Sequence, residues 1–109
     1  MNTKGKIIFA DKFLPMIRDG RKITTVRAGK RDYHICDVYD YYNVDETDHG
    51  YLYIICKYFT TFGELTEKVA QTDGFNSLAE LKGELLQFYP DLKDDSIMTV
   101  IRFVEVEDK

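Results

Sequence analysis

Two neighbouring segments rich in aromatic and β-branched residues constrain the fold of this chain most strongly. They are Ile35–Val44 (ICDVYDYYNV) and Tyr51–Thr60 (YLYIICKYFT), and such residues favour the pleated, half-buried surface of a β-sheet. The polar segment Asp45–Gly50 between them is typical of a hairpin loop. Large apolar side chains occupy both alternating faces of Tyr51–Tyr58. We therefore expect this part to be a central strand that is buried on both sides.

Shorter elements flank this hairpin. The apolar run Lys6–Ala10, the extended segment Thr24–Arg27 and the run Ile97–Val106 predict three further strands. An amphipathic pattern predicts a helix over Lys12–Asp19. Gly20 is suited to end that helix, because glycine readily adopts the left-handed conformation of a helix C-terminus.

Two more helices are expected in the second half of the chain. Thr61 and Ser77 each stand three residues before a glutamate, which is the spacing of a capping box. They predict helices over about Glu64–Gln71 and Leu78–Phe88. The resulting order β-α-β-β-β-α-α-β is α+β, and a curled or closed sheet with helices at its ends fits it best. A length of 109 residues allows one domain, spanning residues 1–109.

Charge is distributed unevenly along the chain. The net charge of −4 argues against tight, non-specific binding of nucleic acid. Residues 1–31 hold nine basic and two acidic groups, whereas residues 32–109 hold six basic and seventeen acidic groups. Residues 18–31 alone carry six basic groups and one acidic group. Such a patch suits a specific anionic or nucleotide-like ligand, and a solvated charged loop is the alternative interpretation.

The cysteines and the hydropathy pattern indicate a cytoplasmic protein. Cys36 and Cys56 lie in apolar or aromatic runs and lack the spacing of a zinc site. We therefore expect two reduced cysteines buried in the core, with no disulfide and no metal. No apolar run approaches the ~18 residues of a membrane span. The apolar run that ends before Asp11 has only four residues, which is too few for a secretory signal.

The segment Gly20–Arg27 (GRKITTVR) stands where a helix is expected to end and a strand to begin. Its pattern Gly-x-Lys-x-x-Thr-x-Arg resembles the opening motif of ASCH domains. The resemblance continues in order along nearly the whole chain, through His34–Val38, Leu65–Lys68, Asp73–Phe75, Glu80–Lys82, Phe88–Pro90 and the last strand to Phe103. The chain looks most like the small bacterial branch of N4-acetylcytidine amidohydrolases. This resemblance implies a small, mixed, PUA-like β-barrel with short helices at its ends, in a superfamily that is linked to RNA binding.

The resemblance also implies roles for individual residues. The catalytic lysine of the branch falls on Lys22, its nucleophilic threonine on Thr25 and its acidic residue on Asp73. Glu67 is a second candidate for the acid if the helix register differs. Three positions, Ile23, Cys36 and Asp73, depart from the family pattern, in which threonine, glycine and glutamate are more usual.

Elementary chemistry sets conditions on these assignments. A threonine hydroxyl such as that of Thr25 is inert unless a base removes its proton. Lys22 can be that base only if its pKa falls from ~10.4 toward ~7–8. Burial and the nearby cations Arg21 and Arg27 would lower this pKa, whereas the Asp73 carboxylate would raise it. Because residues 22 and 25 would point to opposite faces of a regular strand, Lys22 must lie in the turn before the strand.

These observations leave two functions from different classes. The first is a metal-independent amidohydrolase, without a cofactor, that acts on an N4-acetylcytidine-like nucleoside bound by Arg21 and Arg27. The alternative is a non-catalytic RNA-binding module in which phosphates are held by Arg21, Lys22, Arg27, Lys30 and Arg31. The acidic total charge favours the enzyme, whereas aspartate at position 73 favours the module. The expected partner is thus a nucleoside, an RNA-derived small molecule or RNA itself, and not a membrane, and the oligomeric state stays open.

Overall fold

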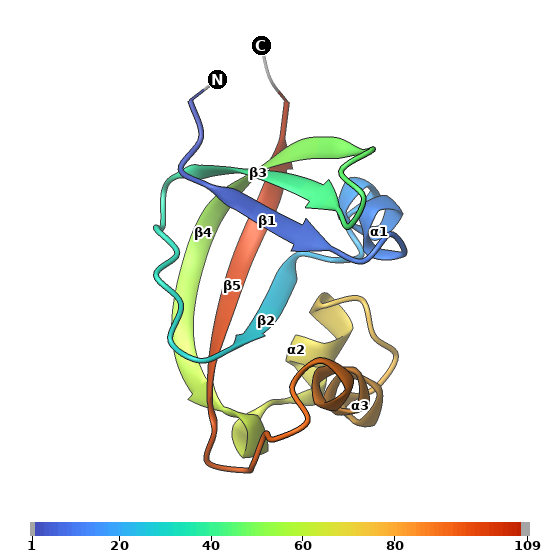
Figure 1. Ribbon diagram of the computed structural model, residues 1–109, viewed down its shortest axis with the longest axis vertical. Coiled ribbons are helices and arrows are strands. Elements are labelled where there is room, and N and C mark those ends of the chain that lie inside the picture. Colours follow the sequence, from blue (N-terminus) through green and yellow to red (C-terminus); the bar gives the residue numbers. More distant parts are fainter. Residues whose placement is uncertain (1, 108–109) are drawn as a thin grey trace.

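The computed structural model describes residues 2–107 as a curled five-stranded sheet with helices along one side (Figure 1). The elements in chain order are β1 (Lys6–Phe9), α1 (Phe13–Asp19), β2 (Thr24–Ala28), β3 (Val38–Asn43), β4 (His49–Thr61), a 3-10 turn (Phe62–Glu64), α2 (Glu67–Thr72), α3 (Leu78–Phe88) and β5 (Ile97–Val106). The expected α+β class and all five expected strands are confirmed. The loop between β3 and β4 confirms the hairpin as well.

The sheet is curled, but it is not closed into a barrel. Its strand order is β1-β3-β4-β5-β2, in which β1 runs parallel to β3 and the other neighbours are antiparallel. The edge strands β1 and β2 are not paired through their backbones. A side chain joins them instead, because Nη2 of Arg27 donates a hydrogen bond of 2.8 Å to the carbonyl oxygen of Ile8. The expectation of a β-barrel is therefore wrong in this respect, and an open seam remains between β1 and β2.

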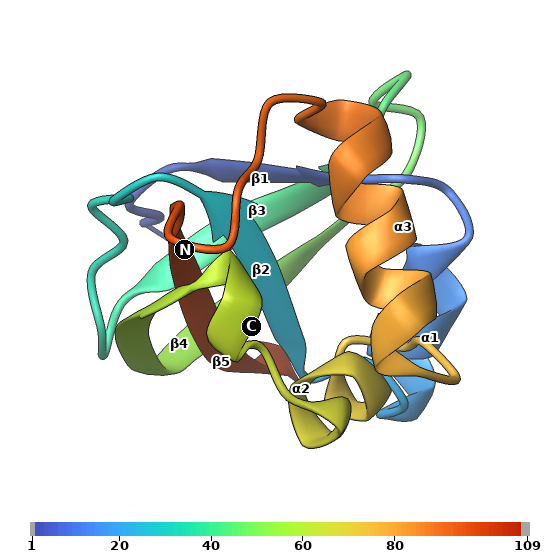
Figure 2. The ribbon, with the colours of Figure 1, turned by 90° about the horizontal axis from the view of Figure 1, so that it is seen from below.

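The long strand β4 has the central position expected of it, between β3 and β5. It is nevertheless not buried on both sides. Leu52 and Ile54 are buried on its inner face, whereas Ile55, Tyr58 and Phe59 are exposed. Figure 2 shows that α1, α2 and α3 gather on the side of the open seam, away from β4.

Most helix boundaries follow the local sequence signals. Gly20 ends α1 with a φ of 85°, as predicted. Ser77 caps α3 by accepting a hydrogen bond from the backbone of the first turn, and α3 has the bounds expected. The helix predicted over Glu64–Gln71 is divided, because the 3-10 turn comes first and α2 begins only at Glu67. Thr66, rather than Thr61, caps α2 through its side chain.

Both cysteines are free and exposed, so the prediction of buried cysteines is wrong. Cys36 lies in the turn before β3, where its φ of 64° is in the left-handed region. Cys56 follows a β-bulge in β4. In a regular strand it would share the inner face with Leu52 and Ile54, and the bulge turns it outward. No helix among residues 2–107 is long and apolar enough to cross a membrane.

Candidate active site

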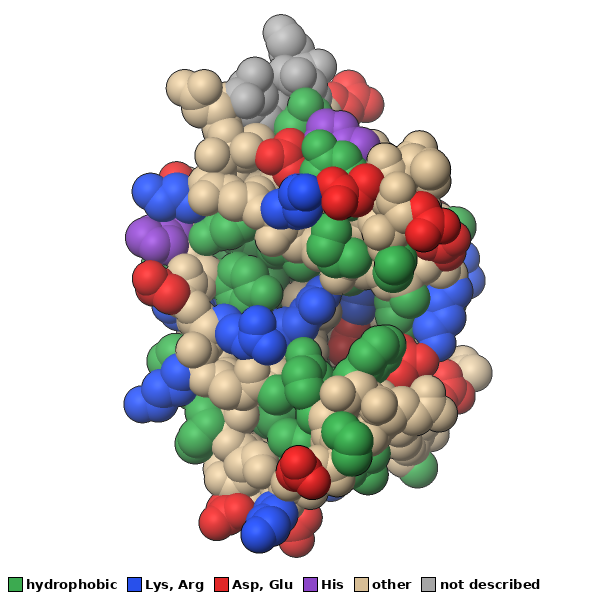
Figure 3. Space-filling view, in the orientation of Figure 1, with side chains coloured by type: hydrophobic (Ala, Val, Ile, Leu, Met, Phe, Trp, Pro, Cys, Tyr) green, Lys and Arg blue, Asp and Glu red, His purple; other side chains and the backbone are tan. Residues whose placement is uncertain are grey.

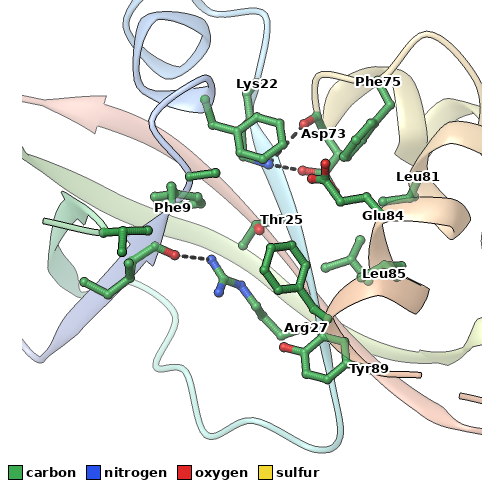
Figure 4. A pocket seen from close by; sticks show the side chains of 16 residues that line it. Phe9, Lys22, Thr25, Arg27, Asp73, Phe75, Leu81, Glu84, Leu85 and Tyr89 are labelled. Atoms are coloured by element: carbon green, nitrogen blue, oxygen red, sulfur yellow. Dashed lines mark hydrogen bonds and ion pairs between the residues drawn. The ribbon is translucent and has the colours of Figure 1, made fainter. Parts of the chain in front are cut away.

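A cavity of about 250 Å³ lies at the open seam of the sheet. The strands β1 and β2 form two of its walls, and α3 covers it from the other side (Figure 4). Lys22, Thr25 and Arg27 reach it from the segment around β2, Asp73 from the end of α2 and Glu84 from α3. The rest of the lining is mainly aliphatic and aromatic. In the space-filling view, basic and acidic side chains are visible inside a hollow in the middle of this face (Figure 3).

Lys22 lies in the turn between α1 and β2, as its assignment requires. Its backbone N–H donates to the carbonyl oxygen of Met16 at 3.0 Å, and the next N–H, of Ile23, donates to that of Thr72 at 2.8 Å. These two bonds fix the turn between α1 and α2. Because β2 begins only at Thr24, the alternation of a strand does not apply to Lys22, and its side chain can share a cavity with Thr25.

Lys22 and Asp73 form a buried ion pair. The two residues are 2% and 3% exposed. Nζ of Lys22 donates to the carboxylate of Asp73 and also to its backbone carbonyl oxygen, at 3.0 Å. Gly74, with a φ of 95°, lets the end of α2 pass close to α1, because a Cβ at that position would lie 2.9 Å from Sδ of Met16. The contact therefore ties the end of α2 to α1 and β2.

Burial shifts both members of this pair toward their neutral forms. Removal from water lowers the pKa of the Lys22 ammonium, although the charge of Asp73 opposes this shift. The same burial raises the pKa of the Asp73 carboxyl to about 6 against the opposing charges of Lys22 and Arg27. A neutral amine can accept a proton. The lowered pKa of Lys22 is a shift in the direction that a lysine needs to act as a base.

Thr25 and Arg27 complete the polar part of the cavity. Thr25 is buried in β2, and the close-up view places it between Lys22 and Arg27 (Figure 4). Besides its bond to Ile8, Arg27 stacks its guanidinium 5.3 Å from the ring centre of Phe9. Nε of Arg27 is buried and has no hydrogen-bond partner among residues 2–107. A buried donor of this kind favours a ligand that offers an oxygen acceptor.

Glu84 is a cavity residue that the sequence analysis did not identify. It lies on α3, lines the cavity and forms an ion pair with Lys12, just before α1. Its negative charge raises the pKa of both Lys22 and Asp73. A signal was present in the sequence, because Glu84 follows Leu81 by three positions and so shares the apolar face of α3.

Two other predicted residues lie outside the cavity. Arg21 is exposed, and its Nε donates to the carboxylate of Asp19 at 2.7 Å. Glu67 is exposed in the first turn of α2, where its carboxylate accepts the N–H of Leu78 at 3.0 Å. Of the two candidate acids, Asp73 is therefore the one that contacts Lys22. In the described part of the chain no three His, Cys, Asp or Glu side chains gather as metal ligands would.

Comparison with solved structures defines the class of fold. Models of protein families and curated proteins give no match to the sequence. An ASCH domain from Lactobacillus crispatus superposes with a TM-score of 0.79 over 93% of this chain and 78% of that chain, at 15% identity. A protein from Enterococcus faecalis gives 0.78 over 97% and 78%, at 14% identity. An ASCH protein from Zymomonas mobilis gives 0.72 over 97% and 71%, at 11% identity. The chain therefore has an ASCH-like fold.

Proposed function

We propose that this protein is an amidohydrolase that removes the acyl group from an N4-acylated cytidine nucleoside such as N4-acetylcytidine. One observation carries the proposal: the buried pair of Lys22 and Asp73 opens into the same small cavity as Thr25. A hydroxyl and an amine that are both buried and line one cavity are the groups that nucleophilic cleavage of an amide needs. The substrate class comes from the resemblance of the sequence to the N4-acetylcytidine amidohydrolases.

In the proposed reaction Lys22 moves the protons and Thr25 forms the covalent bond. The neutral amine of Lys22 takes the proton of the Thr25 hydroxyl, and the oxygen adds to the acyl carbon. Lys22 then returns the proton to N4 of the base, the carbon–nitrogen bond breaks and cytidine leaves. A water molecule, deprotonated by the same amine, hydrolyses the acyl-threonine ester. This step releases the carboxylic acid and restores both side chains.

Arg27 and Asp73 support this chemistry in different ways. When Oγ1 of Thr25 adds to the acyl group, negative charge develops on the carbonyl oxygen, and a fixed donor at that place lowers the barrier. The unpartnered Nε of Arg27 is the donor that we assign to it. Asp73 is a positioning residue, since it holds the amine of Lys22 at two points.

The size and burial of the site favour this function over the non-catalytic RNA-binding module. A cavity of about 250 Å³ is smaller than the ~300–1,000 Å³ of sites for drug-sized ligands, so it suits one base rather than several. Lys22 is buried and paired with Asp73. This basic group is therefore poorly placed to hold the phosphates of a polynucleotide.

The test is the release of cytidine from N4-acetylcytidine by purified protein, followed by chromatography. Thr25→Ala and Lys22→Met should each lower kcat/KM by at least ~10³-fold, while Thr25→Ser should retain part of the activity. Thr60→Ala, which removes a threonine hydroxyl from β4 outside the cavity lining, is the matched control. Turnover by the wild type that is no faster than that of Thr25→Ala would reject the proposal.

A further inference from the structure

A second depression, of about 310 Å³, lies between the start of β1 and the segment that follows β2. Its lining is basic and aromatic, although the chain as a whole carries a net charge of −4. The basic residues are Lys4, Lys6, Arg31 and His34, and the aromatic residues are Tyr33 and Tyr39. Asp32 is the single acidic residue that lines it within the described part of the chain, and its side chain is almost fully exposed.

The fold holds this depression in a defined shape. The rings of Tyr33 and Tyr39 meet edge to face with their centres 5.8 Å apart. The hydroxyl of Tyr39 accepts the backbone N–H of His34 at 2.8 Å, and the backbone N–H of Lys4 donates to the carbonyl oxygen of Val38 at 2.7 Å. Both walls of the depression are thus attached to β3.

Arg31 is anchored at its base and retains donors for a ligand. Its backbone N–H donates to Oγ1 of Thr99 at 2.9 Å, and its Nε donates to the carbonyl oxygen of Ala28 at 2.7 Å. A guanidinium carries five N–H donors, so these contacts leave most of them for an anion. Lys6 forms an exposed ion pair with Glu46 at 2.6 Å, and an exposed pair of this kind contributes little and can rearrange.

The depression adjoins the cavity of the proposed active site. Nη2 of Arg31 lies 3.5 Å from the hydroxyl of Tyr89, which lines that cavity. The strand β1 is a wall of both, with Lys6 in the depression and Ile8 in the cavity. Residues two apart on a strand are separated by about 7 Å, so one nucleotide can reach both. Figure 3 shows basic side chains and a histidine around a hydrophobic area next to the central hollow, on the same face.

We propose that this depression is a phosphate subsite and that the ligand of the neighbouring cavity is a phosphorylated cytidine rather than the bare nucleoside. The base enters the cavity, and the phosphate on its ribose is bound by Lys4, Lys6 and Arg31. A mononucleotide and a nucleotide within an RNA chain share this chemistry. The inference rests on the proposed function only for the identity of the base.

Binding of the unacylated products tests the subsite without any turnover. Isothermal titration calorimetry at low salt should compare cytidine, its 5′- and 3′-monophosphates and a cytidine-centred RNA trinucleotide. At least one phosphorylated ligand should bind about tenfold more tightly than cytidine. The double variant Lys4→Gln/Lys6→Gln should abolish this difference and leave the affinity for cytidine unchanged. The control Lys68→Gln/Lys93→Gln removes the same charge from exposed positions that line neither pocket.

Each outcome bears on one of the two proposals. Equal affinities for cytidine and all phosphorylated ligands, no binding of any of them, or a phosphate preference that survives in Lys4→Gln/Lys6→Gln would overturn the subsite. A preference for the trinucleotide over both monophosphates would identify an RNA chain as the source of the phosphate. If the preference is present but no cytidine is released from N4-acetylcytidine, only the proposed hydrolysis fails. If release occurs without the preference, only the subsite fails.

Discussion

The side chains of Lys22 and Asp73 meet in an ion pair that is almost completely shielded from water, although 51 positions separate them in the sequence. Taking two charges out of water costs several kcal/mol per ion, and this cost is offset only when the partners stay together. The pair therefore links the stability of the fold to the geometry of the proposed site.

Breaking this pair should destabilise the protein more than removing it as a whole. Lys22→Met or Asp73→Leu leaves the other group buried without its partner, and each should lower the free energy of unfolding by about 3–5 kcal/mol. The double variant should lose much less than the sum of the two. Urea denaturation followed by circular dichroism measures all three. Strictly additive losses would show that the two side chains are not coupled.

The pH dependence of stability should show the titration of Asp73. Its pKa is about 6 in the folded protein, because of burial, and ~3.9 in the unfolded chain. The folded state therefore binds the proton more tightly. The stabilisation from this group is fully present below about pH 4 and is lost as the pH rises through about 6. As the pH rises from 4 to 7, the free energy of unfolding of the wild type should therefore fall relative to that of Asp73→Asn, by an amount on the order of 3 kcal/mol. A difference between the two proteins that is constant from pH 4 to 7 would contradict the raised pKa of Asp73.

Replacement of Glu84 by glutamine should move the pH profile of the reaction. The groups that face this carboxylate are Lys12 beside α1, Lys22 before β2 and Asp73 at the end of α2. Loss of the negative charge lowers the pKa of Lys22, so the neutral amine forms at lower pH. The rising limb of kcat/KM should shift to lower pH in Glu84→Gln. The exposed Glu80 on α3 provides the control Glu80→Gln, whose limb should stay in place; an unshifted limb in Glu84→Gln would exclude this role.

Cys36 offers a test of backbone conformation. Its φ of 64° is costly for a residue with a Cβ, and the family that the sequence resembles more often has glycine there. Cys36→Gly should therefore be about 0.5–1 kcal/mol more stable than Cys36→Ala, which loses the same thiol but keeps the unfavourable conformation. Thermal or urea unfolding measures the difference. Equal stabilities would mean that this turn relaxes at no cost.

Local signals in the sequence were sufficient for much of the fold. The spacing of Ser77 and the leucines after it predicted the bounds of α3, because capping and helical periodicity act within a few residues. Gly20 marked the end of α1 for the same reason. The divided helix after Thr61 shows where such signals fail. Thr61 has the capping-box spacing, but Thr66, which has no glutamate three positions later, caps α2.

Long-range relationships were harder to infer. Whether β1 and β2 pair depends on the curl of the whole sheet. In this protein a hydrogen bond from the side chain of Arg27 joins the two strands, instead of backbone hydrogen bonds. The outward turn of Cys56 depends on a bulge that no periodicity indicates. Within the site, the motif around Lys22 and Thr25 was found from the resemblance, whereas Glu84 belongs to a different helix and becomes adjacent only when α3 packs over the seam.

Detection of an acyl group on Thr25 is the most direct test of the central claim. The protein is mixed with N4-acetylcytidine, quenched in acid within the first turnovers and digested, and the peptide that contains residue 25 is analysed by mass spectrometry. The account predicts one acetyl ester on Thr25 that decays as acetate is released, and its absence from Thr25→Ala. Release of cytidine at the wild-type rate by Thr25→Ala, with no acetylated peptide in either protein, would contradict the account.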